Sequence, residues 1–191
     1  MKKLTAILCA VAMVAATCVT SFAKVSIGPA GQLENGGKAT NVSAIGITLP
    51  AEGIIVREAK ATDYPDGSKE DSFVEAFESE KTLADALAKV DFTAPMTTDG
   101  GKTVDPKTVK LLTSPLVFAN AVTGEVLKGD GKLKITFPGN ENTKGKDSDK
   151  VASVQMGPDG TIHVVDMTVD KDANTLTAIF PCIGPFVIVG L

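Results

Sequence analysis

The chain has 191 residues but no tryptophan, a single tyrosine (Tyr64) and a single histidine (His163). Carbohydrate-binding modules usually stack sugars on exposed aromatic rings, so this composition disfavours a lectin. One histidine cannot build the usual zinc site, and a Ser-His-Asp triad would depend on His163 alone. We therefore expect His163 to be structural or on the surface. The sequence nominates no catalytic residue, metal ligand or cofactor-binding residue, and we expect a protein that is not an enzyme.

Cysteine is scarce as well, with three in the whole chain. Cys9 and Cys18 lie in an N-terminal segment that we expect to be removed, which leaves Cys182 without a partner for an internal disulfide. We expect Cys182 to be buried as a small apolar side chain. An intermolecular disulfide or a reactive thiol is the alternative.

The N-terminus has the pattern of a secretory signal peptide. Basic residues at positions 2 and 3 precede an uncharged, mostly apolar stretch, residues 4–19, and Ser21-Phe22-Ala23 supplies the small residues of a cleavage site. We therefore predict a signal peptide at 1–23 and a secreted protein. An uncleaved membrane helix is disfavoured because the stretch is short. A lipoprotein is disfavoured because no small residue precedes Cys18.

Removal of residues 1–23 takes two lysines and no acid. It leaves 17 basic and 23 acidic residues, a net charge of −6. An acidic secreted domain has no electrostatic reason to bind nucleic acid or anionic lipid, so we expect neither as a partner.

The first part of the mature chain has mixed character. Residues 24–41 are rich in glycine and predict a flexible leader. Residues 42–92 predict an α+β portion, because two runs of β-branched residues flank a turn at 50–53 and a helical periodicity follows. Ser72 and Glu75 fit a capping box, and Thr82 is a second possible N-cap, so residues 72–90 form either one helix or two.

From residue 93 to residue 191 the pattern changes to short strands separated by turns, which predicts an antiparallel β-sandwich. The turns at 157–160 and 170–174 are rich in residues that tolerate tight or left-handed conformations. The expected strands are 108–113, 115–122, 124–127, 132–138, 150–156, 161–169, 175–180 and 186–190. The expected core residues are Leu133, Ile135, Phe137, Val154, Ile162, Val164, Leu176, Phe186 and Ile188.

The chain ends in an apolar run, residues 186–191, that follows Gly184-Pro185. Six residues fall far short of the roughly 20 needed to span a bilayer. No basic cluster follows the run and no LPxTG-type motif precedes it, so we expect release from the cell and not anchoring to the wall. The run predicts a central strand that is covered on both faces.

Two acidic loops suggest calcium as an alternative. Residues 170–181 begin like an EF-hand loop but have Pro181 where the bidentate glutamate belongs. Residues 140–150 contain three acids, but lysines alternate with them. A hairpin turn explains the residues at 170–174 better than a calcium site does, and a solvated loop explains those at 140–150 better.

Residues 124–139 and 151–191 resemble an Ig-like β-sandwich module that occurs at the C-terminal ends of extracellular proteins of Firmicutes. The matching motifs are Phe137-Pro138, Asp159-Gly160 and Gly184-Pro185-Phe186, with Gly184 in place of the usual serine. The resemblance covers roughly residues 100–191. It implies a surface-exposed accessory domain and carries over no chemistry.

These observations favour a secreted, non-catalytic binding or structural module, such as a cell-surface or adhesion accessory, whose partner is a protein or a cell-surface component. Two alternatives remain open. A calcium- or glycan-binding module would use the acidic loops. A secreted hydrolase would need two of the scattered carboxylates to meet in the fold.

Overall fold

The structure is a computed structural model that describes residues 37–93 and 95–191. The predicted signal peptide and most of the predicted leader lie outside the described residues. In chain order the elements are β1 (Gly37–Lys38), β2 (Thr40–Ile45), β3 (Ile54–Glu58), α1 (Lys69–Ser79), α2 (Leu83–Lys89), β4 (Met96–Thr97), β5 (Thr103–Val104), β6 (Lys110–Leu111), β7 (Leu116–Asn120), β8 (Lys132–Pro138), the 3₁₀-helix η1 (Ser148–Lys150), β9 (Val151–Met156), β10 (Ile162–Asp170), β11 (Thr175–Phe180) and β12 (Phe186–Gly190).

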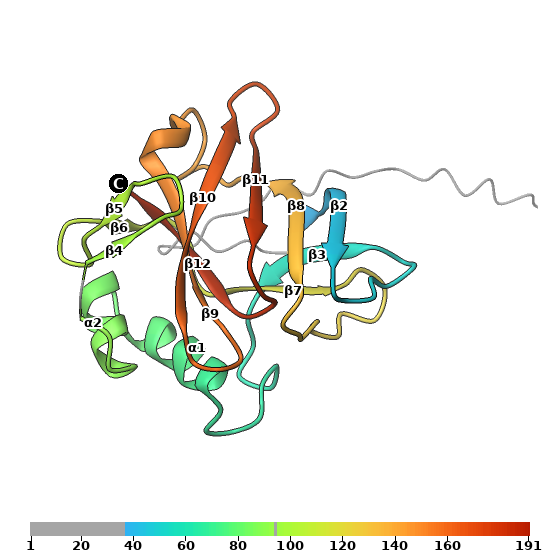
Figure 1. Ribbon diagram of the computed structural model, residues 1–191, viewed down its shortest axis with the longest axis horizontal. Helices are drawn as coiled ribbons and strands as arrows, with labels where there is room; N and C mark the ends of the chain where they lie inside the picture. The colour runs from blue at the N-terminus through green and yellow to red at the C-terminus, as the bar shows by residue number, and fades with distance from the viewer. Residues whose placement is uncertain (1–36, 94) are drawn as a thin grey trace, which may run out of the picture.

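The fold is mainly antiparallel β with short helices, as predicted (Figure 1). One ten-stranded sheet runs in the order β1-β3-β7-β12-β9-β10-β11-β8-β2, and β6 pairs with β12. Because β1 and β2 follow each other in the chain but lie at opposite ends of this order, the sheet curls until its ends meet. The expected sandwich is thus formed by two halves of a single curled sheet.

The main core lies between these two halves. Ile54, Phe118 and Ile188 come from β3, β7 and β12, and Ile135 and Leu176 come from β8 and β11, yet all belong to one cluster and are at most 1% exposed. Burial of each such side chain contributes about 1.5–3 kcal/mol. The core therefore fixes the face-to-face packing of the two halves without any disulfide.

Most of the predicted core residues are buried, but Ile162 and Val164 are only half-buried. These two pack against a second apolar cluster on the outer face of the sheet and not into the main core, because side chains alternate along β10. Val165 and Met167 point into the main core, and their neighbours therefore face the outer side of the sheet.

The C-terminal strand β12 lies inside the sheet, between β9 and the strands β6 and β7, as predicted. Phe186 and Ile188 belong to the main core, and Val187 and Val189 belong to a second cluster on the other face. An apolar run without alternation is what a strand covered on both faces requires.

The helical region forms two helices. The first begins earlier than predicted, because Ser68 is its N-cap: the Ser68 hydroxyl accepts from the Asp71 amide at 3.1 Å. The capping box predicted at Ser72 and Glu75 is therefore wrong, and both residues lie within α1. The predicted cap at Thr82 is confirmed, since its hydroxyl accepts from the Asp85 amide at the start of α2.

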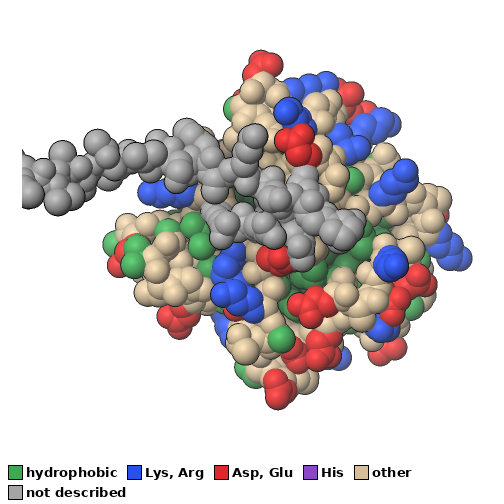
Figure 2. Space-filling model, turned by 180° about the vertical axis from the view of Figure 1, so that it is seen from behind, with side chains coloured by type: hydrophobic (Ala, Val, Ile, Leu, Met, Phe, Trp, Pro, Cys, Tyr) green, Lys and Arg blue, Asp and Glu red, His purple; other side chains and the backbone are tan. Residues whose placement is uncertain are grey.

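Helices α1 and α2 and the β4–β5 hairpin cover the outer face of only one half of the sheet. Phe73 and Leu87 of the helices pack with Val154 and Val189 of β9 and β12 in the second cluster. In Figure 1 the helices lie beside β9 and β12, whereas β8, β11 and β2 carry no helix. Seen from behind the view of Figure 1, acidic and basic side chains of the described residues are interspersed on the surface (Figure 2).

Several predicted boundaries differ from the structure. Residues 37–41, assigned to the leader, form β1 and the start of β2. The division at residue 93 does not separate two sheets, because β2 pairs with β8 and β3 pairs with β7. The strand expected at 124–127 is reduced to an isolated bridge between Ala119 and Val126, and the strand expected at 108–113 is reduced to β6.

Candidate binding site

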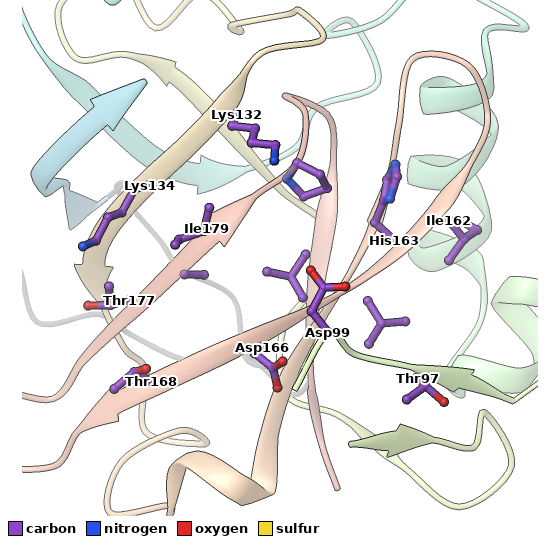
Figure 3. Close-up of a pocket in the computed structure, with 14 residues that line it drawn as sticks. Thr97, Asp99, Lys132, Lys134, Ile162, His163, Asp166, Thr168, Thr177 and Ile179 are labelled. Carbon is purple, nitrogen blue, oxygen red and sulfur yellow. The ribbon is translucent and has the colours of Figure 1, made fainter. Parts of the chain in front are cut away.

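Strands β10 and β11 pair only at one end and then separate. Residues 167–170 pair with residues 175–178, next to the turn that joins the strands. Beyond that point, residues 162–166 pair with β9 and residues 179–180 pair with β8. The separation is visible in Figure 1 and opens a notch of about 720 Å³ (Figure 3).

The notch is lined by the edges of these strands and by one neighbouring hairpin. The lining residues are Thr97, Asp99, Lys132, Lys134, Ile162, His163, Val164, Val165, Asp166, Thr168, Thr177, Ala178, Ile179 and Pro181. Consecutive residues of β10 contribute, whereas a depression on the face of a sheet would be lined by alternate residues. The notch therefore exposes backbone as well as side chains.

The hydrogen-bond register shows where this backbone points. At the start of the β9–β10 hairpin, the Gly157 amide donates to the Thr161 carbonyl at 2.8 Å. Hydrogen-bonded and non-hydrogen-bonded pairs alternate in an antiparallel ladder, so His163 bonds to β9 and the peptide groups of Ile162 and Val164 point away from it. Among the described strands, none pairs with β10 on that side before residue 167.

Three of the charged or polar lining residues come from three different elements. Lys132 comes from β8, His163 from β10 and Asp99 from the turn between β4 and β5, and they surround a common space in Figure 3. Lys134 extends along the outer face of β8. Within the described part of the chain, no acidic side chain forms an ion pair with either lysine.

Asp166 fastens the β4–β5 hairpin to the wall of the notch. Its carboxylate accepts from the Gly100 amide at 2.6 Å and lies 3.0 Å from the Lys102 ammonium. A side chain at position 100 would displace the Asp166 carboxylate, because its Cβ would lie 2.5 Å from the Asp166 oxygen. Burial tends to raise the pKa of Asp166, but bonds from Lys102, Gly100 and Thr98 outweigh it, so the pKa is lowered. The carboxylate stays charged and the wall stays in place.

The structure places His163 in the notch, half-buried, which the sequence did not indicate. No hydrogen bond from another described side chain reaches its imidazole. A histidine that acts as a base in a triad needs a hydrogen-bonded third group to fix its tautomer and orientation. Asp159 interacts with His163 electrostatically, but its carboxylate accepts hydrogen bonds from Thr161.

The two acidic loops are held by internal contacts. Asp170 accepts from the amides of Asp172 and Ala173, which forms the predicted hairpin turn. The loop at 140–150 is not wholly solvated as predicted, because Asn140 and Thr143 are buried within it. Asp147 forms an ion pair with Lys171, so the loops contact each other. Among residues 37–93 and 95–191, no group of three or more His, Cys, Asp or Glu side chains could hold a metal ion.

Cys182 is buried as predicted, and 6% of its surface is exposed. Its thiol donates to the Gln155 side-chain carbonyl over 3.6 Å. Burial, with smaller contributions from nearby carboxylates, raises the pKa of the Cys182 thiol to about 11. The thiol is therefore neutral, and a neutral thiol is a poor nucleophile.

No helix of the described residues is long and apolar enough to cross a membrane. Comparison of the chain with models of protein families, with curated proteins and with solved structures finds no match.

Proposed function

We propose that this protein is a secreted, non-catalytic binding module and that its binding site is the notch between β10 and β11 with the outer face of β8 beside it. One observation carries the proposal. Among the described residues, helices and a hairpin cover one half of the curled sheet, no helix covers the other half, and Ile179 of the notch at its border is 59% exposed. Exposed apolar side chains beside a polar rim are typical of interaction sites.

The chemistry of the notch favours binding over catalysis. Lys132 and Asp99 are available to a ligand, the wall is fixed by Asp166, and no described group orients His163 as a base. The lining includes no Phe, Tyr or Trp on which a sugar could stack, which favours a protein partner over a glycan. The partner we propose is a protein at the cell surface.

Site-specific photocross-linking tests this function. Benzoylphenylalanine replaces Ile179 in the notch or Val122 in the turn after β7, where the side chain is 74% exposed. Both residues are apolar and exposed, so Val122 controls for reactivity that depends on exposure alone. On intact cells that export the protein, we expect a discrete cross-linked product from position 179 only. Equal products from both positions, or none from 179, would refute the proposal.

Export is part of the proposal and rests on the signal-peptide pattern of residues 1–23. Mass spectrometry of protein from the culture medium should find Lys24 at the N-terminus. An intact Met1, or a lipid on Cys18, would contradict it.

A further inference from the structure

We propose that the ligand of the notch is an extended peptide that adds as a strand to the free edge of β10 and directs acidic side chains toward Lys132 and Lys134. This inference rests on the proposed binding function and specifies its ligand. It follows from the backbone of the notch, its floor and its charge.

The backbone supplies the first argument. The peptide groups of Ile162 and Val164 point into the notch, and no described strand pairs with them there. On the facing strand, residue 177 hydrogen-bonds toward β10, so by alternation Ile179 also directs its peptide group into the notch. An edge of repeated donors and acceptors is satisfied by another backbone with the same repeat, which is how peptides add to exposed sheet edges.

The floor and the volume supply the second argument. Val165 and Ala178 line the notch from the core side and are 6% and 3% exposed. A strand that enters the notch points alternate side chains inward, onto this apolar floor, and outward, along the face of β8. The volume of about 720 Å³ lies within the range of about 300–1,000 Å³ found for ligand pockets.

The charge supplies the third argument. The chain as a whole is acidic, but Lys102 already neutralises Asp166 beside the notch. The remaining charges are Asp99 on one wall and Lys132 and Lys134 on the β8 side, neither of which pairs with an acid in the described residues. The outward side chains of a bound strand run along the lysines, so acidic residues at these positions are favoured.

Designed peptides test the inference directly. The probe is acetyl-(Val-Glu)₃-amide, whose valines and glutamates fall on opposite faces when it is extended. Acetyl-(Val-Lys)₃-amide controls for charge. Two further analogues are N-methylated at every valine or at every glutamate, and each loses the amide donors of one edge only. We expect the Val-Glu peptide to bind, the Val-Lys peptide to bind at least tenfold more weakly, and at least one N-methylated analogue to lose at least tenfold in affinity.

Charge reversal locates the site. Lys132→Glu with Lys134→Glu should weaken the Val-Glu peptide at least tenfold and reverse the preference toward the Val-Lys peptide. Lys107→Glu, at an exposed lysine outside the notch, should change neither affinity. A circular dichroism spectrum like that of the unmodified protein shows that each variant is folded.

Failure of this inference can be told apart from failure of the proposed function. If position 179 gives a cross-link but the Val-Glu peptide does not bind, or binds with no effect of N-methylation or charge reversal, the notch binds a partner by another mode and the inference is overturned. If position 179 gives no cross-link, the proposed function itself is refuted.

Discussion

Replacement of Gly184 by alanine should destabilise the protein strongly. Gly184 precedes β12, and a Cβ at this position would lie 2.1 Å from the carbonyl oxygen of Met156, whereas real Cβ contacts are not found under 3.0 Å. The backbone at Gly184 and the backbone at Met156 would have to separate by roughly 1 Å. The Met156 carbonyl oxygen belongs to the main chain and cannot move away as the end of a flexible side chain could. The Met156 amide donates to the Pro185 carbonyl at 3.0 Å next to this contact, so that bond would break.

The magnitude follows from these two effects. Loss of a buried hydrogen bond costs about 1–3 kcal/mol, and overpacking costs about 1–3 kcal/mol, so we expect a loss of about 2–6 kcal/mol. For a chain of this size, 1 kcal/mol lowers Tm by about 2–4 °C, which gives a fall of roughly 4–24 °C. Urea and thermal unfolding, followed by circular dichroism, measure both quantities.

Gly190→Ala is the matched control at the other end of β12. There the nearest atoms to a new Cβ are methyl carbons of Leu112 at 3.3 and 3.5 Å, which can move. We expect a change within about 1 kcal/mol. Equal stability of the two variants would refute the close approach at Gly184. Gly184→Ser should behave like Gly184→Ala, because it adds the same Cβ.

Three further predictions concern charged and buried groups. Asp63→Ala should cost about 3 kcal/mol or more in urea unfolding, because it leaves Arg57 unpaired beneath the surface; the two now form paired 2.7 Å bonds with side chains 11% and 8% exposed, and a loss under 1 kcal/mol would contradict this. Cys182 should react with Ellman's reagent at pH 8 only when the protein is unfolded, since its pKa is about 11; rapid labelling of the native protein would show that the thiol is accessible. The lowered pKa of Asp166 means that its stabilising effect is present above its unfolded pKa of about 3.9 and is lost as the pH falls through the lower folded value, so Asp166→Asn should be less stable than the unmodified protein at pH 7 and should approach it in stability below about pH 4. A difference that persists unchanged at pH 2 would contradict the assignment.

The sequence predicted the elements whose signals are local. The pattern of residues 132–138 predicted the strand β8, the unbroken apolar run predicted β12 as a central strand, and Thr82 predicted the start of α2. These features depend on residues a few positions apart, and the structure confirms them.

The sequence could not predict features that depend on distant contacts. Residues 37–41 contribute to β1 and β2 because β3 and β8 pair with these strands. The glycine-rich composition of this segment does not indicate strands. Ile162 and Val164 were predicted to lie in the core because they are apolar. Which face of the sheet their side chains occupy depends on the register of β10. The notch has no sequence signal at all, because it arises where β10 changes partners from β9 to β11. Its lysines could be recognised only as residues of a solvated strand face.

Amide hydrogen exchange at β10, measured by NMR, tests whether the edge of this strand in the notch is free. The amides of His163 and Val165 bond to β9 and serve as internal controls, whereas those of Ile162 and Val164 point into the notch. We expect fast exchange at Ile162 and Val164 and slow exchange at His163 and Val165 in the free protein, with protection of the first pair when the Val-Glu peptide is added. Slow exchange at all four positions in the free protein would contradict this expectation, because the edge of β10 would then be already occupied.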